Sequence, residues 1–295
     1  MNAVSNKVSE WRPVVQELDE WARTGVRANF WMRDDDAFKL TPQLDRLTAF
    51  ARDFSVKIGL AVIPAKLTDP LVKYLNSGEA PYYPMVHGYR HVNYGAQRRP
   101  GEFGSERPLA LLIDDATSAL EAFTDRFKGH SPIFVPPFAC ITQELVDELP
   151  KLGFKGVSTG PTPIERRYAR LCARVGALRP VFHKVGRRAF HYDVHIDPFD
   201  WGRDSSRSAV SMANELVGFL RARRRGFVDV ASPIGVLMHH LKFDDPTWAV
   251  CAELLEIVAH HPATSWPPVE VIVESEPVVS SSSISKSSTK GIFAD

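Results

Sequence analysis

Residues 28–36 have the sequence Ala-Asn-Phe-Trp-Met-Arg-Asp-Asp-Asp, an apolar run that ends in three adjacent acids. Its length and its aromatic side chains predict a buried β-strand that stops where the acids begin. Pro42 stands in the first turn of the helical pattern that follows, in which apolar residues recur at helical spacing: Leu44, Leu47, Phe50, Ala51 and Phe54. A strand followed directly by an amphipathic helix indicates a β-α unit.

The same alternation continues along the chain. Further strands are predicted at residues 56–63, 83–87, 132–135, 155–159, 190–196, 234–239 and 268–273, and further helices at 68–75, 108–127, 142–152, 206–224 and 246–260. Repeated β-α units predict parallel strands joined by right-handed crossovers. About seven or eight such units suit a closed or partly closed barrel better than two open sheets.

Three segments fall outside this pattern. Residues 88–107 are rich in Gly, Arg and Tyr and predict a long loop, which in a compact domain is usually functional. Residues 161–188 carry many arginines and predict no clear element. From Ser280 onward the chain is rich in serine, which predicts a disordered tail over residues 276–295. Since no linker interrupts the chain before this tail, we expect a single α/β barrel domain over residues 1–275.

The composition excludes several classes of protein. Lysine and arginine number 36 against 35 acids, a formal net charge of +1, which argues against a protein that mainly neutralises nucleic acid. The basic run 221–225 is expected to be a solvated helix end. Cys140, Cys172 and Cys251 stand at no metal-ligand or disulfide spacing. With no apolar run near the roughly 20 residues that span a bilayer, and no signal-peptide core, we expect a cytoplasmic protein.

Distinctive segments follow five of the predicted strands, at the point where each strand ends, and four of them carry charged or imidazole side chains. These segments are Arg33-Asp34-Asp35-Asp36, His87–His91, Pro136-Pro137-Phe138, Asp197–Trp201 and His239-His240. Each has an ordinary structural explanation when taken alone, such as a solvated acidic turn or a satisfied core histidine. Because the carboxyl ends of parallel strands meet at one edge, we expect them to converge on one mouth of the barrel. Carboxylates and imidazoles gathered there are suited to hold a catalytic metal ion.

In this order the segments resemble the five motifs of the polysaccharide deacetylase family, the NodB-homology carbohydrate esterases. Asp34–Ala37 resembles the last four places of the family's Thr-Phe-Asp-Asp-Gly turn, and His87–His91 its His-x-x-x-His motif. The remaining matches are Val135–Phe138 with Arg-Pro-Pro-Tyr, Asp197–Trp201 with Asp-x-x-Asp-Trp, and Leu237–His239 with Leu-x-His. The resemblance covers about residues 28 to 245. It implies a distorted (β/α)7, TIM-like barrel and the metal-dependent removal of an N-acetyl group from an amino sugar.

The resemblance also implies the roles of the groups that carry out the reaction. It makes Asp35 the general base and His239 the general acid that protonates the leaving amine. It makes Asp36, His87 and His91 the ligands of a divalent metal ion, which we expect to be zinc.

Further residues are implied to support these groups or to bind the sugar. Asp200, or alternatively Asp197, would orient the acidic histidine. Trp201 would form a wall of the sugar pocket, with Tyr89 near its mouth. The backbone N–H of Phe138 would help to hold the oxyanion.

The sequence departs from the family pattern at several places, and two of these departures bear on the catalytic groups. Val135 stands where the third motif has an arginine that supports the base, and Arg33, from a different strand, is a candidate replacement. The third acid, Asp34, leaves two alternatives for the working pair, Asp34 with Asp35 or Asp35 with Asp36. We prefer Asp35 with Asp36, because this register follows the family's Asp-Asp-small pattern.

Two other functions remain open. A related barrel could hydrolyse another non-peptide C–N bond, as in a cyclic ureide or a formamide, and the missing arginine favours this alternative. A catalytically silent barrel would bind a sugar or a partner protein without releasing a product. For the deacetylase, the lack of an export signal favours a cytosolic substrate, such as a nucleotide- or lipid-linked precursor of a surface polysaccharide.

Overall fold

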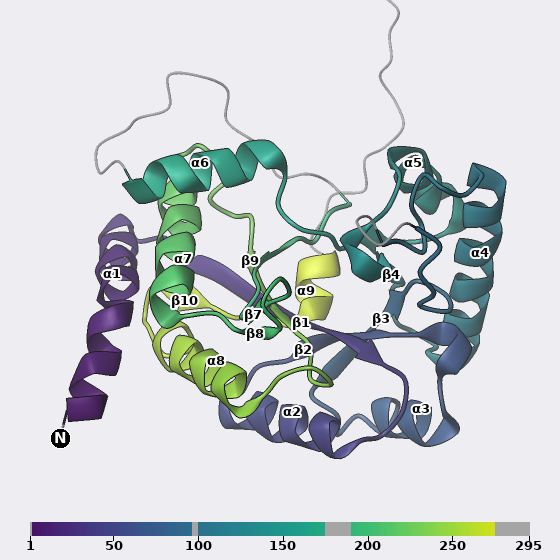
Figure 1. Ribbon diagram of the computed structural model, residues 1–295, viewed down its shortest axis with the longest axis horizontal. Coiled ribbons are helices and arrows are strands. Elements are labelled where there is room, and N and C mark those ends of the chain that lie inside the picture. The colour runs from purple at the N-terminus through teal and green to yellow at the C-terminus, as the bar shows by residue number, and fades with distance from the viewer. Residues whose placement is uncertain (1, 96–99, 175–189, 275–295) are drawn as a thin grey trace, which may run out of the picture.

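A parallel β-sheet forms the centre of the molecule in the computed structural model, which describes residues 2–95, 100–174 and 190–274 (Figure 1). Its strands lie in the order β5-β4-β3-β2-β1-β9-β6. Their bounds are β1 Ala28–Ala37, β2 Ile58–Val62, β3 Tyr82–His87, β4 Ile133–Val135, β5 Gly156–Val157, β6 Val194–Ile196 and β9 Ile234–Met238. A short strand, β10 (Thr264–Ser265), pairs in parallel with the first residues of β1. All the predicted strands but one are therefore confirmed, with bounds that shift by a few residues.

The two edges of this sheet meet. Val157 in β5 accepts a backbone hydrogen bond from Tyr192 and donates one to Phe190, and Val194 donates one to Thr159. Residues 190–194 thus connect β5 to the chain that enters β6, so the sheet curls into a distorted barrel. The predicted single α/β barrel is confirmed.

Helices cover the outer face of the sheet (Figure 1). Their bounds are α1 Asn2–Thr24, α2 Pro42–Asp53, α3 Asp69–Leu75, α4 Leu109–Arg126, α5 Gln143–Leu152, α6 Pro163–Arg174, α7 Ala209–Arg224 and α8 Asp245–Val258. Four of them begin at a side chain that accepts a backbone N–H of the first turn, namely Thr41, Thr142, Ser208 and Asp244. Their apolar faces and the outward side chains of the strands, such as Phe30 and Met32, form one continuous core.

A second, smaller core fills the inside of the barrel, and here one prediction is wrong. Residues 268–273 were expected to form a strand, but Val269–Glu274 form the helix α9. Val269, Ile272 and Val273 pack against inward side chains of the strands, including Trp31 and Tyr83. Alternating apolar residues favour a strand, but the spacing of these three also places them on one helix face. The apolar barrel interior selects the helix, which Figure 1 shows among the strands.

Part of the unassigned arginine-rich segment forms α6, which a buried polar cluster connects to α7 and β6. Glu165 lies 2.9 Å from the Arg223 guanidinium and 3.2 Å from the His195 ring. Burial alone would raise the pKa of Glu165, but His195 and Arg223 lower it to about 2. Residues 175–189 lie outside the described residues.

Two further findings complete the fold. After β6, the strands β7 (Phe199–Asp200) and β8 (Ser205–Ser206) form a small antiparallel hairpin beside the barrel mouth. No helix in the described part of the chain combines the length and the apolar character needed to cross a membrane. The serine-rich tail predicted at 276–295 lies outside the described residues.

Candidate metal centre and catalytic groups

The three acids at the end of β1 point in different directions because the strand contains a bulge. The register between β1 and β2 shifts between Asp34 and Ala37, and Asp36 has a φ of 73°. A bulge of this kind re-aims one side chain. Asp35 and Asp36 consequently line the same pocket at the mouth of the barrel. Asp34 has no exposed surface and lies on the other face of the strand, toward the helices.

Asp34 contacts His240, the residue that follows the candidate general acid His239. One of its carboxylate oxygens accepts the backbone N–H of His240 at 2.8 Å, and the other lies 2.5 Å from Nδ1 of the same residue. These contacts hold the end of β9 against β1, next to His239. In the described geometry, Asp34 has a structural position, and Asp35 and Asp36 form the pair that faces the pocket.

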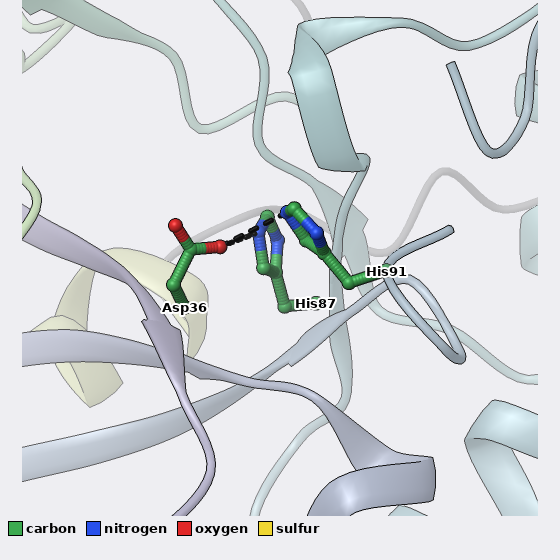
Figure 2. Close-up of side chains that lie close together, drawn as sticks. All are labelled: Asp36, His87 and His91. Atoms are coloured by element: carbon green, nitrogen blue, oxygen red, sulfur yellow. Dashed lines mark hydrogen bonds and ion pairs between the residues drawn. The ribbon is translucent and has the colours of Figure 1, made fainter. Parts of the chain in front are cut away.

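Asp36 lies between two imidazole rings (Figure 2). Its Oδ1 atom is 3.1 Å from Nε2 of His87 and 3.0 Å from Nε2 of His91. The ligand atoms of the three residues all lie within 4.8 Å of one another, a grouping that a single metal ion could join. Two histidines and one carboxylate with space beside them are a donor set that zinc commonly takes in hydrolases. The residues present therefore fit a divalent metal ion.

Hydrogen bonding and charge in this cluster prepare it for a cation. Nδ1 of His87 lies 3.1 Å from the Val135 carbonyl oxygen and so carries the proton, which leaves Nε2 to face Asp36. Burial alone would raise the pKa of Asp36, but the two histidines hold it well below its usual range. Burial alone would lower the pKa of His87, but Asp35 and Asp36 raise it above its usual value. A metal ion would supply the positive charge that Asp36 otherwise draws from its two histidine neighbours.

Asp35 is held by an arginine on the same strand. Two nitrogens of Arg33 donate to its two carboxylate oxygens at 2.8 and 2.9 Å. Both side chains are buried, with 4% and 6% of their surface exposed. A third nitrogen of Arg33 donates to the carbonyl and hydroxyl oxygens of Ser158 at 3.0 and 2.7 Å. Arg33 is thus the arginine that contacts Asp35, whereas Val135, which stands where the resemblance expects an arginine, lies in the inner core.

His239 completes the polar wall on the other side of Asp35. Its Nε2 atom lies 3.9 Å from Oδ2 of Asp35, and its ring contacts the edge of Trp201 at a centroid distance of 4.7 Å. The Trp201 indole in turn donates to Asp197 at 2.9 Å. Burial raises the pKa of Asp197, and the nearby His239 partly opposes this rise. Of the two aspartates named from the sequence, Asp197 is the one that lines the pocket.

Asp200 and Tyr89 lie elsewhere. The Asp200 carboxylate accepts the backbone N–H groups of Gly202 and Arg203 and so shapes the turn between β7 and β8. The Tyr89 ring packs against the outer core, with the Arg90 guanidinium 4.3 Å from its centre. Neither residue is among those that line the pocket.

A strained turn follows β4 at the third motif. Phe138 and Ala139 have φ values of 59° and 52°, in the left-handed region that non-glycine residues rarely adopt. The Phe138 ring packs on His91 at a centroid distance of 4.7 Å. No acceptor for the Phe138 backbone N–H is found among the described residues. Strain of this kind is often stored at functional sites, and here it lies beside the candidate metal ligand His91.

These groups surround one pocket of about 460 Å³. Its lining consists of Arg33, Asp35, Asp36, His87, His91, Pro100, Phe138, Ala139, Asp197, Trp201, Leu237 and His239. The sequence reasoning missed Ser158 and the buried Glu102, which contact the lining residues from behind. Neither residue belongs to a motif, so no local signal marks them.

Comparison with known proteins shows the fold. No model of a protein family matches the sequence, and no curated protein matches it. A putative polysaccharide deacetylase from Mycobacterium smegmatis has a similar structure, with 17% identity over 79% of this chain and 76% of that chain, at a TM-score of 0.51. A family 4 carbohydrate esterase from Streptomyces lividans, solved with acetate, has 14% identity over 79% of this chain and 88% of its own, at a TM-score of 0.45. A family 4 pseudoenzyme from Bacillus anthracis has 13% identity over 79% of this chain and 60% of its own, at a TM-score of 0.44. The resemblance expected from the motifs is thus confirmed at the level of the fold.

Proposed function

We propose that the protein is a metal-dependent carbohydrate N-deacetylase, a hydrolase that removes an acetyl group from the nitrogen of an amino sugar. The observation that carries this proposal is the Asp36-His87-His91 cluster beside Asp35 and His239 in a single pocket. The sequence motifs and the shared fold support it.

The metal ion would be held by Asp36, His87 and His91, and we expect it to be zinc. When bound, such an ion polarises the acyl carbonyl and lowers the pKa of a water molecule.

The residues of this chain would supply the proton transfers. Asp35, oriented by Arg33, accepts a proton from the attacking water. As the C–N bond breaks, His239 donates a proton to the leaving amine, which would otherwise leave poorly. The Phe138 N–H donates to the oxyanion that forms on the former carbonyl oxygen. Loss of one such donor typically slows turnover by about 10²–10³-fold.

The pocket rim would bind the sugar. Trp201 keeps 55% of its surface exposed although its ring edge contacts His239. An exposed indole at the rim of a polar pocket is suited to stack on the apolar face of a sugar ring. We therefore assign the substrate to N-acetylated sugars, either free, polymeric, or linked to a nucleotide or lipid.

Metal analysis coupled to an acetate-release screen tests this proposal. The purified protein is assayed for bound metal and for acetate released from N-acetylated sugars, nucleotide-linked sugars and oligosaccharides. Cyclic ureides and formamides are included, because the alternative hydrolase would act on them. His87→Ala should lose metal and activity together, whereas His260→Ala, a change of the same kind at an exposed position, should lose neither.

The outcomes separate the candidate functions. Acetate release that requires the metal supports the deacetylase. Turnover of a ureide or formamide alone supports the other hydrolase. Tight binding of a sugar without any product supports the silent barrel, and full metal content in His87→Ala contradicts the ligand assignment.

A further inference from the structure

The loop that carries His91 is organised around one buried carboxylate. The backbone N–H groups of three successive residues point at Glu102: Tyr89 at 3.3 Å, Arg90 at 2.7 Å and His91 at 3.1 Å. Two of these bonds go to Oε2 and one to Oε1. The loop turns sharply around this carboxylate, with a φ of 55° at Gly88 and 54° at His91.

Glu102 is completely buried, so these hydrogen bonds take the place of water around its carboxylate. It has no exposed surface. A carboxylate withdrawn from water must be compensated by hydrogen bonds, and a carboxylate accepts several N–H groups at once. A Cβ atom at Gly88 would lie 2.3 Å from Oε2 of Glu102 and 2.5 Å from Pro137, so the carboxylate is packed tightly against the loop. The position of Glu102 therefore fixes the path of residues 88–91.

A second layer of contacts anchors Glu102 to the outer helices. Arg107 donates to its backbone carbonyl oxygen at 3.0 Å. The Arg107 and Arg90 guanidinium groups both pair with Asp115 in α4, at 2.7 and 3.0 Å. The turn that holds His91 is thus connected through Glu102 to a rigid helix.

His91 depends on this support more than its neighbour in the candidate metal centre does. His87 lies at the end of β3, has a side chain that is only 3% exposed, and has its ring fixed by the Val135 carbonyl. His91 belongs to a loop, and its side chain is 22% exposed. Within the described residues its Nδ1 atom has no hydrogen-bond partner, so apart from the packing of Phe138 on its ring, its position depends on the backbone of the loop.

We propose that Glu102 is a positioning residue for metal binding, which acts through the backbone of residues 89–91 to aim His91 at the ion. The inference rests on the proposed function, because it takes His91 to be a metal ligand. Groups that orient metal ligands typically contribute about 10–100-fold to metal affinity. Without the hydrogen bonds to Glu102, we expect His91 to be poorly oriented and the metal to bind more weakly by about this factor.

Glu102→Gln tests the proposal with nearly the same side-chain shape. Glutamine has one acceptor oxygen and places an NH₂ group where the other carboxylate oxygen meets backbone N–H groups. The dissociation constant for Zn²⁺ is measured by competition with a chromophoric chelator, and the melting temperature of the metal-free protein is recorded alongside. We expect zinc binding to weaken by about 10–100-fold. Glu106→Gln, the same change at an exposed position of the loop, should bind zinc like the unmodified protein.

A double-mutant cycle separates positioning from a general structural role. If Glu102 acts through His91, Glu102→Gln should cause no further loss of zinc affinity in a His91→Ala background. In a His87→Ala background, measured at zinc concentrations high enough to load this weakened site, Glu102→Gln should still weaken binding, because His91 remains. An equal factor in both backgrounds would indicate loosening of the whole barrel mouth and would overturn the proposal.

The remaining outcomes are equally decisive. A Glu102→Gln protein with unchanged zinc affinity overturns this inference and leaves the proposed function intact if the unmodified protein binds zinc and releases acetate. An unmodified protein that binds no metal overturns both. If Glu102→Gln does not fold, Glu102→Asp is used in the same cycle. It keeps the charge but draws the carboxylate back by one methylene, so a smaller loss that disappears in the His91→Ala background is expected.

Discussion

Replacing Arg33 by methionine tests whether this arginine supports the proposed general base, Asp35. The guanidinium makes two hydrogen bonds to Asp35 and two to Ser158, all between buried atoms. Methionine has a similar length but no charge and no donor. Arg33→Met therefore leaves the Asp35 carboxylate buried without its counter-charge.

The size of the effect follows from the burial of the pair. Removing one partner of a buried ion pair costs about 3–5 kcal/mol, because the remaining charge is uncompensated. For a protein of this size that corresponds to a fall in Tm of roughly 5–15 °C. Arg23→Met is the matched control, because Arg23 pairs with Glu20 at an exposed site where both side chains are largely in water. Such a surface pair contributes at most about 1 kcal/mol.

Thermal and denaturant unfolding measure the stability, and acetate release and metal content measure the function. We expect Arg33→Met to lose turnover while it keeps its metal, because Arg33 contacts none of the three candidate ligands. Arg33→Lys keeps the charge but cannot make the paired hydrogen bonds. Its stability and turnover should lie between those of Arg33→Met and the unmodified protein.

A double-mutant cycle with Asp35→Asn shows whether the loss of the Arg33–Asp35 ion pair causes the fall in stability. Asparagine at position 35 removes the charge that the Arg33→Met protein cannot compensate, so the double variant should be less destabilised than the sum of the two single changes. Additive losses, or an Arg33→Met protein as stable as Arg23→Met, would refute the reasoning.

The other predictions concern the two groups proposed to transfer protons, Asp35 and His239, and two structural acids, Asp34 and Glu165. Asp35→Asn should keep metal and fold but lose turnover, whereas Asp34→Asn should keep metal and lose about 1–3 kcal/mol of stability; a metal-free Asp34→Asn protein would contradict the assigned register. His239→Ala should spare metal content and slow acetate release, and an equal effect of His240→Ala would leave the acid unassigned. Glu165, with its pKa lowered from 4.5 to about 2, contributes stability above pH 4.5 that is lost as the pH falls toward 2. The difference in stability between the unmodified protein and Glu165→Gln, about 3 kcal/mol at pH 7, should shrink over that range in urea titrations, and a constant difference would contradict this origin.

Hydrophobic periodicity was sufficient for most of the fold. The strand at 28–36 and the helix after it are marked by local signals, namely an apolar run, a proline and a helical stripe. The same signals failed at residues 268–273, where strand and helix patterns overlap. There the choice depended on the barrel interior, which accepts the three apolar side chains of α9 on one helix face.

The candidate site, like the fold, could be predicted from the sequence only in part. Two histidines and a carboxylate could be expected together from the sequence because they stand at strand ends, which parallel topology brings to one edge. The choice of Asp36 among the three acids came from the resemblance to the deacetylase motifs. The direction of each side chain could not be predicted, because a bulge in β1 and a hairpin after β6 decide which of several aspartates faces the pocket. Asp36 faces it through the bulge, and Asp197 faces it in place of Asp200.

By itself the sequence determined the alternation of strands and helices, the mouth at which polar groups gather, and the chemical types available there. Only the tertiary structure decided that Arg33 clamps Asp35, that Ser158 holds Arg33, and that Glu102 shapes the loop of His91. The physical reason is that hydrophobic periodicity records which face of a strand or helix is buried, and this pattern can be recognised from residues close together in the sequence. A hydrogen bond depends on the positions of two atoms. Ser158, 125 residues after Arg33, reaches it only after the barrel has closed, and Glu102, 11 residues after His91, reaches it only when the loop folds back on itself.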